Sequence, residues 1–107
     1  MKSKFVKNER IECADGFSMS VQASSYNYCQ PRINDADVYT EVEVGFPSEY
    51  ESLLAPYADD PENYVRTVYA WVPSDIIVLV CAKHGGVTSG EMPDGIPYLR
   101  SDNNASR

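Results

Sequence analysis

Apolar and polar residues alternate along two stretches of this chain, and this alternation predicts two half-buried strands. In residues 17–23 the odd-numbered positions are apolar, and in residues 38–46 the even-numbered positions are apolar or threonine. A strand buries one face and exposes the other through this period of two residues. A shorter strand at residues 11–13 is expected to pair with the first, because Asp15-Gly16 is typical of a tight hairpin turn.

Residue composition and the residues that begin or end helices predict the later elements. Residues 65–72 (VRTVYAWV) are rich in β-branched and aromatic side chains, which favours a strand. Ser48 and Glu51 have the spacing of a capping box, so a short helix is expected there, ended by Pro56. Residues 75–84 contain many β-branched residues, but Ser74 as N-cap, the basic last turn and Gly85-Gly86 indicate a helix.

This order of elements predicts an α+β fold. We expect a mostly antiparallel sheet of about four strands, in the order β-β-β-α-β-α, with two helices packed on one face. Residues 1–10 are expected to form a basic flexible arm, residues 11–86 a single domain, and residues 87–107 a loosely ordered tail rich in Gly, Pro, Ser and Asn.

Length and apolar content limit the class of protein. A chain of 107 residues has room for one domain, and its longest apolar run, residues 76–82, is far shorter than a membrane-spanning helix. The start of the chain has lysines but no apolar core of a signal peptide, so a cytosolic location is expected. The three cysteines have wide spacings, which favours buried, reduced thiols over a disulfide framework.

Charge changes the picture most. The net charge is −7, and residues 12–75 hold twelve carboxylates against only Arg32 and Arg66. Such a region cannot bind nucleic acid directly, since phosphate neutralisation requires lysine and arginine. A strong negative field can instead attract a basic partner, although the same acidity could serve only to keep the protein soluble.

No motif indicates catalysis. The single histidine, His84, is placed where a cation complements a helix C-terminus, and that structural role is favoured over a catalytic one. Gly85-Gly86 lacks the residues of a phosphate-binding loop, and no cysteine and histidine spacing of zinc type occurs. We therefore expect a protein that is not an enzyme and that uses no cofactor or metal.

Two sets of surface residues are candidates for binding. Glu41 and Glu43 alternate onto one strand face about 6.6 to 6.8 Å apart, close to two phosphate steps of about 3.4 Å along a DNA strand. The expected partner-binding set is acidic and aromatic: Glu41, Glu43, Glu49, Glu51, Asp59, Asp60, Glu62, Tyr39 and Tyr57. The alternative set would bind a small anionic ligand: Tyr26, Tyr28, Arg32 and Arg66. A solvated strand face and tyrosines that simply pack around the core would give the same pattern.

Three stretches of the chain resemble small accessory proteins of bacteriophages and prophages. They are CADGFSMSVQAS at residues 13–24, VEVGFPSE at residues 42–49, and YADDPENYVRTVYAWVP at residues 57–73 followed by KHGG at residues 83–86. The resemblance covers residues 11–86 and identifies no active site. Small acidic proteins of this kind include inhibitors of host defence, among them anti-CRISPR proteins that resemble DNA in charge.

The resemblance and the charge together predict a non-enzymatic inhibitor of a host nucleic-acid-directed defence complex. Its acidic, DNA-mimicking surface would bind a Lys/Arg-rich site on a basic host protein or nucleoprotein complex, without a membrane, as a monomer or small homo-oligomer. Two alternatives stay open. One is a module that sequesters a small ligand or nucleotide signal, and the other is a virion or assembly accessory protein.

Overall fold

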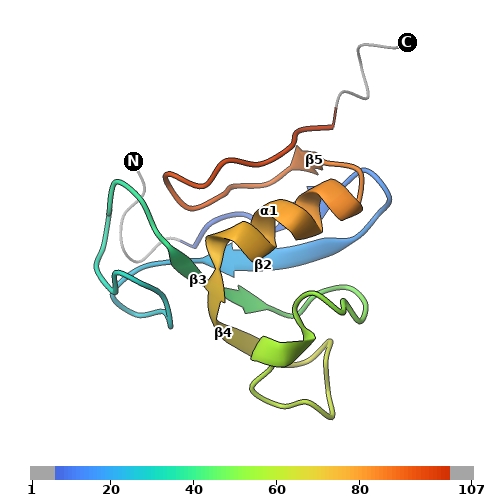
Figure 1. Ribbon diagram of the computed structural model, residues 1–107, viewed down its shortest axis with the longest axis horizontal. Coiled ribbons are helices and arrows are strands. Elements are labelled where there is room, and N and C mark those ends of the chain that lie inside the picture. Colours follow the sequence, from blue (N-terminus) through green and yellow to red (C-terminus); the bar gives the residue numbers. More distant parts are fainter. Residues whose placement is uncertain (1–6, 102–107) are drawn as a thin grey trace.

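A five-stranded antiparallel sheet with one α-helix across it makes up residues 7–101, the part of the chain that the computed structural model describes (Figure 1). The strand order is β4-β3-β2-β1-β5, and α1 leads from β4 at one edge to β5 at the other. The predicted α+β class is confirmed, although the sheet has five strands and one α-helix instead of four and two. The elements are β1 Ile11–Cys13, β2 Ser18–Gln22, β3 Glu41–Gly45, the 3-10 helix η1 Ala55–Tyr57, β4 Val68–Pro73, α1 Ser74–Lys83 and β5 Val87–Ser89.

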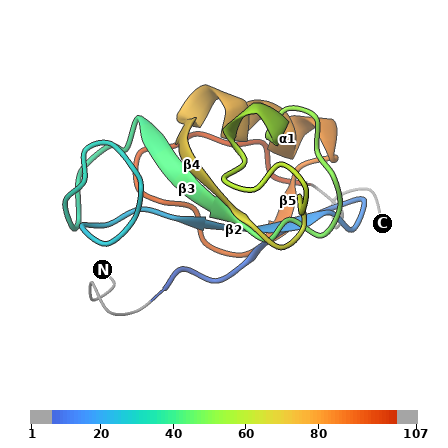
Figure 2. The same ribbon diagram turned by 90° about the horizontal axis from the view of Figure 1, so that it is seen from below.

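The core lies between the sheet and α1, which covers one face of the sheet only (Figure 2). The alternation predicted for β2 is confirmed, because Met19 and Val21 are buried whereas Ser18 and Ser20 are not. In β3 the same holds for Val42 and Val44. The buried residues of α1 are Ile77, Val80 and Cys81. Within residues 7–101 no helix covers the other face of the sheet, which is called the open face below and along which only a short part of the chain runs (Figure 2).

The helix expected after Ser48 is absent, because tertiary contacts use both residues of the predicted capping box. The Ser48 hydroxyl accepts a hydrogen bond from the Ser18 backbone N–H at 2.9 Å. The Glu51 side chain turns toward α1 and contacts Lys83 and His84. Only the short η1 forms, with Pro56 in its first turn. A local capping pattern is thus overridden by long-range partners.

Residues 87–101 are not the loose tail that composition predicts. Val87 and Ser89 of β5 pair with β1, where Cys13 faces Val87 and Glu12 faces Ser89. Ile96, further along, is buried against the core. The backbone of β1 offered an unpaired edge, and burying apolar side chains beside it stabilises the segment. Residues 102–107 of the expected tail lie outside the described residues.

Residues 7–10 are bound to the sheet, whereas a free arm was expected. The Asn8 N–H donates to the Gln22 side chain at 2.9 Å, and the Gln22 amide donates back to the Asn8 carbonyl at 2.9 Å. The Arg10 guanidinium donates to the Ser18 hydroxyl at 2.9 Å. These residues run along the side of the sheet opposite α1 (Figure 2). Residues 1–6 of the expected arm lie outside the described part of the chain.

Two strands are shorter or shifted relative to the predicted ranges. The strand expected at residues 38–46 is regular only in β3, since Val38 and Phe46 are about half exposed. The strand expected at residues 65–72 begins at Val68, because residues 63–66 form a turn in which the Arg66 N–H donates to the Asn63 carbonyl. The helix expected at residues 75–84 is confirmed as α1, which ends at Lys83.

Candidate recognition surface

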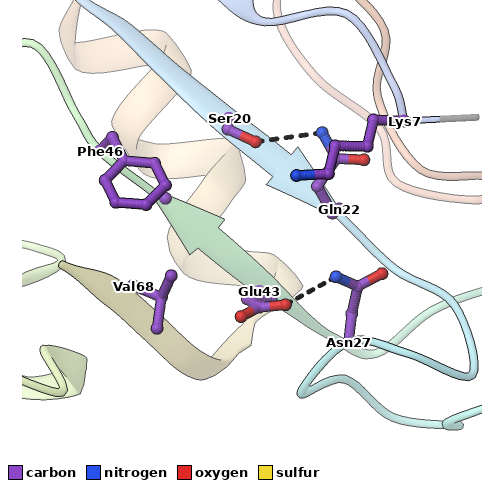
Figure 3. Close-up of a pocket in the computed structure, with 8 residues that line it drawn as sticks. Lys7, Ser20, Gln22, Asn27, Glu43, Phe46 and Val68 are labelled. Atoms are coloured by element: carbon purple, nitrogen blue, oxygen red, sulfur yellow. Dashed lines mark hydrogen bonds between the residues drawn. The ribbon is translucent and has the colours of Figure 1, made fainter.

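The open face of the sheet carries a small, half-open pocket that combines polar and apolar side chains (Figure 3). Strands β2 and β3 supply its floor through the positions that alternate away from the core. Gly45 has no side chain and leaves room there, since an added Cβ would lie 3.7 Å from the Ser20 Cβ. The lining residues are Lys7, Ser20, Gln22, Asn27, Glu43, Gly45, Phe46 and Val68.

Glu43 is the acidic group of this pocket. Its Oε1 accepts a hydrogen bond of 2.6 Å from the Asn27 side chain, drawn as a dashed line in Figure 3. Asn27 in turn is held by the Ser24 hydroxyl at 2.6 Å. Because its side chain is partly buried, Glu43 is screened less from a bound cation than a fully exposed carboxylate. Phe46 and Val68 provide an apolar wall beside it.

The structure brings together only part of the predicted acidic set. Glu41 and Glu43 lie on the open face of β3, as the alternation predicted. The loop of Asp59, Asp60 and Glu62 and the residue Glu41 lie at opposite ends of β4. The Asp59 N–H donates to the carbonyl of Val68, the first residue of β4, whereas Glu41 pairs with Pro73, the last. Five residues of strand correspond to roughly 17 Å. The acidic residues therefore do not form one continuous patch.

The acidic loop is ordered by its own carboxylate. Asp60 accepts hydrogen bonds from the Asn63 side chain and from the Glu62 backbone N–H, both at 3.0 Å. The Asn63 bond first, and the Glu62 bond second, lower the pKa of Asp60 below its ordinary value. Asp59 and Glu62 remain exposed, as does Glu49. These three side chains are available to a partner.

Two members of the predicted partner-binding set are buried, so the prediction is wrong for them and their roles are structural. Glu51 is 1% exposed and Tyr39 is 3% exposed. The Tyr39 hydroxyl donates to the Ile33 carbonyl at 2.7 Å and accepts from the Ala36 N–H at 3.1 Å, which fixes the loop before β3. Tyr57 is half-buried against the core. Neither Glu51 nor Tyr39 can contact a partner in this fold.

The alternative ligand set is also divided by the fold. Tyr28 and Arg32 come together, with the Arg32 guanidinium carbon 5.1 Å from the centre of the Tyr28 ring. Tyr26 is exposed in the same loop. Arg66 lies in the turn before β4, whereas Tyr28 contacts Trp71 near the other end of that strand. A single small ligand cannot readily be held by all four residues.

Trp71 is a surface residue that sequence reasoning missed. It was placed inside a strand, yet its side chain is 47% exposed and its ring lies 5.0 Å from that of Tyr28. Its backbone has a φ of +49°, in the left-handed region that non-glycine residues rarely adopt. The register shifts between Val42 and Val44, which marks a β-bulge. In VYAWV, residues 68–72, apolar and polar residues do not alternate, and this departure from the two-residue period of a strand was the sign of the bulge in the sequence.

A charged network joins the hairpin turn, the loop before η1 and the end of α1. Its members Glu51 and His84 are buried, whereas Asp15 and Lys83 are about half exposed. The His84 Nδ1 lies 2.6 Å from Asp15 Oδ2, and its Nε2 lies 2.6 Å from Glu51 Oε1. Lys83 donates to Glu51 Oε2 at 2.8 Å. Phe17 stacks on the imidazole with ring centres 4.1 Å apart. Both ring nitrogens are engaged, so neither is free to accept a proton from a substrate in this arrangement.

Within the network, the pKa values of His84, Glu51 and Asp15 are shifted toward the charged forms. Burial alone would lower the pKa of His84, but the hydrogen bonds to Glu51 and Asp15 raise it above 6.5. Burial alone would raise the pKa of Glu51, but hydrogen bonds from Lys83, the Leu53 N–H and His84 lower it below 4.5. The predicted position of His84 as a cation at the helix end is thereby explained by two carboxylates in addition to the helix dipole.

These opposite shifts predict a stability maximum between about pH 4.5 and 6.5. The His84 contribution is complete below its ordinary pKa of 6.5 and is lost as the pH rises through the higher folded-state value. The Glu51 contribution is present above its ordinary pKa of 4.5 and is lost as the pH falls through the lower folded-state value. Urea unfolding at a series of pH values measures this profile.

The loss of stability at pH values above 6.5 is expected to come from His84. Three titratable groups face or act on its ring: Asp15 from the hairpin turn, Glu51 from its loop and Cys13 from β1. Lys83 of α1 pairs with Glu51. The variant His84→Gln should flatten the decline of the urea midpoint over the interval that begins at pH 6.5 and extends to higher pH. A wild-type midpoint that stays level or rises over that interval contradicts the expected sign.

The three cysteines are free and buried, as expected. Cys13 and Cys81 share a hydrogen bond between β1 and α1; it lowers the pKa of Cys13 and, with burial, raises that of Cys81. Within residues 7–101, no group of three or more histidine, cysteine or acidic side chains is arranged to hold a metal ion. In the same part of the chain, no helix has the length and apolar character to cross a membrane.

The fold is that of a small antiparallel α+β protein, in which one α-helix covers one face of a five-stranded sheet (Figure 2). Comparison with protein-family models, with curated proteins and with solved structures gives no match to this chain. Function therefore has to be inferred from the surface itself.

Proposed function

We propose that this protein is a non-enzymatic binding protein that holds a Lys/Arg-rich surface of another protein on the open face of its sheet. The observation that carries the proposal is the placement of Glu41 and Glu43 side by side on that face, with Glu43 half-buried in the pocket. A partner lysine can reach this carboxylate while its alkyl stem packs on Phe46 and Val68. The net charge of −7 adds long-range attraction for a basic partner.

The specific form of the proposal is an inhibitor of a host nucleic-acid-directed defence complex, acting in the bacterial cytosol. A protein surface that binds nucleic acid is rich in lysine and arginine, so it is the kind of surface that carboxylates at phosphate-like spacing can occupy. The resemblance to small phage accessory proteins supports the same class of partner. The division of the acidic set means that the open face, and not one continuous acidic row, forms the contact.

A second candidate, a module that sequesters a small ligand, is favoured by one observation. Tyr28 and Arg32 do come together, and Trp71 adds a second ring to them. Aromatic rings with a guanidinium could hold a nucleotide signal. The net negative charge of the protein repels a phosphate ligand, so this candidate is ranked second. A virion or assembly component is the third, and large homo-oligomers in size-exclusion chromatography would favour it.

The proposal predicts a salt-sensitive partner that DNA displaces. The tagged protein is incubated with bacterial lysate, and retained proteins are identified by mass spectrometry after washes at low salt and at about 1 M salt, where screening acts over about 3 Å. We expect a nucleic-acid-binding protein or complex that elutes with salt and with added DNA. Capture that resists both treatments contradicts an electrostatic interface.

Neutralising the open face should weaken this interaction about tenfold at low salt. The double variant Glu41→Gln and Glu43→Gln removes two charges, while the new amide oxygen at position 43 can still accept the hydrogen bond from Asn27. The matched control, Asp75→Asn with Asp94→Asn, removes the same charge at exposed positions outside β3. Equal losses in both double variants would show that only net charge matters, and no loss in either would sink the proposed surface.

A further inference from the structure

The position of Trp71 follows from a conflict inside β4. Tyr69 and Val72 are both fully buried, although they are three residues apart and a regular strand would point them to opposite faces. The chain resolves this with a bulge, in which Ala70 and Trp71 together face Glu43 of β3. Trp71 is thereby turned out to solvent, onto the open side of the sheet.

This conformation is held from outside the strand. The left-handed backbone of a bulky residue costs on the order of 1 to 3 kcal/mol and persists only where surrounding contacts fix it. Here the Trp71 N–H donates to the Tyr28 carbonyl at 3.1 Å, and the two rings contact at 39°. Tyr28 is itself 43% exposed. The chain thus keeps a bulky, exposed tryptophan at a position where the backbone is strained. Backbone strain of this kind often occurs at functional sites.

The chemistry around the two rings selects a cation. Arg32 already stacks on Tyr28, so a guanidinium is accepted at this cluster within the chain itself. The register places Glu43 opposite the bulge and Glu41 opposite Pro73, on the strand next to Trp71. Indole is the best aromatic partner for a cation, and a planar guanidinium can stack on it while its N–H groups bond a carboxylate. A phosphate or nucleotide would meet repulsion from both glutamates.

We propose that Trp71 and Tyr28 form an anchor for an arginine side chain of the partner, which stacks on Trp71 and pairs with a carboxylate of β3. This inference rests on the proposed function, because it names the group that the basic partner presents. The anchor gives the interface the tryptophan, tyrosine and arginine composition of energetic hot spots. The acidic face then steers the partner, and Trp71 selects arginine over lysine.

The single tryptophan of the chain makes the anchor directly observable. The probes are capped tetra-arginine and tetra-lysine peptides, titrated at low salt while Trp71 fluorescence is recorded and binding is followed independently by calorimetry. We expect saturable quenching or a spectral shift with tetra-arginine, and an affinity about fivefold higher than for tetra-lysine of equal charge. Equal affinities with unchanged fluorescence overturn the anchor but leave the proposed function standing.

Two variants separate stacking from folding. Trp71→Asn removes the ring but tolerates the left-handed backbone, so its thermal unfolding midpoint should stay within about 5 °C of the wild type. Trp71→Phe keeps a ring with a weaker attraction for cations. Calorimetry should show tetra-arginine affinity falling stepwise from the wild type to Trp71→Phe to Trp71→Asn, down to the tetra-lysine level.

The outcomes distinguish the two proposals. Unchanged tetra-arginine affinity in a folded Trp71→Asn variant overturns the anchor alone. Failure of both peptides to bind the wild type overturns the anchor and weakens the basic-partner function with it. A fluorescence response to adenosine monophosphate without a response to tetra-arginine also overturns the anchor, and it would favour the ligand-sequestering module.

Discussion

Replacement of Glu51 by glutamine is expected to destabilise the protein by about 3 to 5 kcal/mol, the usual cost of removing one partner from a buried ion pair. The Glu51 carboxylate is 1% exposed and accepts from Lys83, His84 and the Leu53 N–H. Glutamine keeps the size but removes the charge, which leaves the protonated His84 with Asp15 as its remaining carboxylate partner. Urea unfolding monitored by circular dichroism measures the loss.

Glu49→Gln is the matched control, since Glu49 is exposed two residues away in the same loop. Its expected change is within about 0.5 kcal/mol, as for most surface substitutions. If Glu51→Gln lost less than about 1 kcal/mol, the network would have no structural role. His84 and Glu51 would then become candidates for a functional site, because their shifted pKa values would not be explained by a contribution to stability.

Gly90→Ala is expected to destabilise the protein by a similar amount, about 3 to 5 kcal/mol, because strain and overpacking add. Gly90 has a φ of +109° where the segment after β5 passes the residues before β1. An added Cβ would lie 2.6 Å from the Ile11 Cα and closer still to the Arg10 carbonyl oxygen. Both obstacles are backbone, so the segment after β5 has to move.

Gly16→Ala separates the two causes. Gly16 has a similar φ of +97° in the hairpin turn, but nothing lies within 4 Å of its added Cβ. Strain alone should cost about 1 kcal/mol there, near the lower end of the range for left-handed residues. Equal urea midpoints for the two variants would mean that residues 87–101 are as loosely attached as their composition predicts.

The buried network and the open face have separate roles in this fold. Asp15, Glu51, Lys83 and His84 join three segments on the helix side of the molecule and satisfy one another's charges. Glu41 and Glu43 lie on the face of the sheet that points away from the core. The proposed recognition surface is placed on this second group, because its carboxylates take no part in the network.

Several elements could be predicted because their signals are local. The alternation in β2 is read within seven residues, and it correctly separates the buried Met19 and Val21 from Ser18 and Ser20. The helix α1 is present despite its β-branched interior, and it ends before Gly85 as predicted. Ser74 was predicted as its N-cap, but Ser74 is the first residue of the helix, Pro73 is at the N-cap, and no side chain caps this end. A two-residue period and a glycine after the last helical turn depend on neighbouring residues alone, so they are kept in the folded protein.

Other predictions failed where a residue had a stronger distant partner. Glu51 was assigned to a capping box and to the binding surface, yet it is buried against His84, 33 positions away. The tail was expected to be loose, yet β5 pairs with β1 across more than seventy residues. Neither partner can be read from a local window, because each is selected only after the core has formed.

The sequence by itself determined the α+β class, the strands with clean alternation, the helix α1, the buried cysteines and the acidic surface. Each of these depends on side-chain period, capping or charge, which neighbouring residues define. The tertiary structure decided the position of Trp71, since only the joint burial of Tyr69 and Val72 forces the bulge. It also decided the partners of Glu51 and the pairing of β5, because buried charges and open strand edges must be satisfied wherever the chain brings a group within reach.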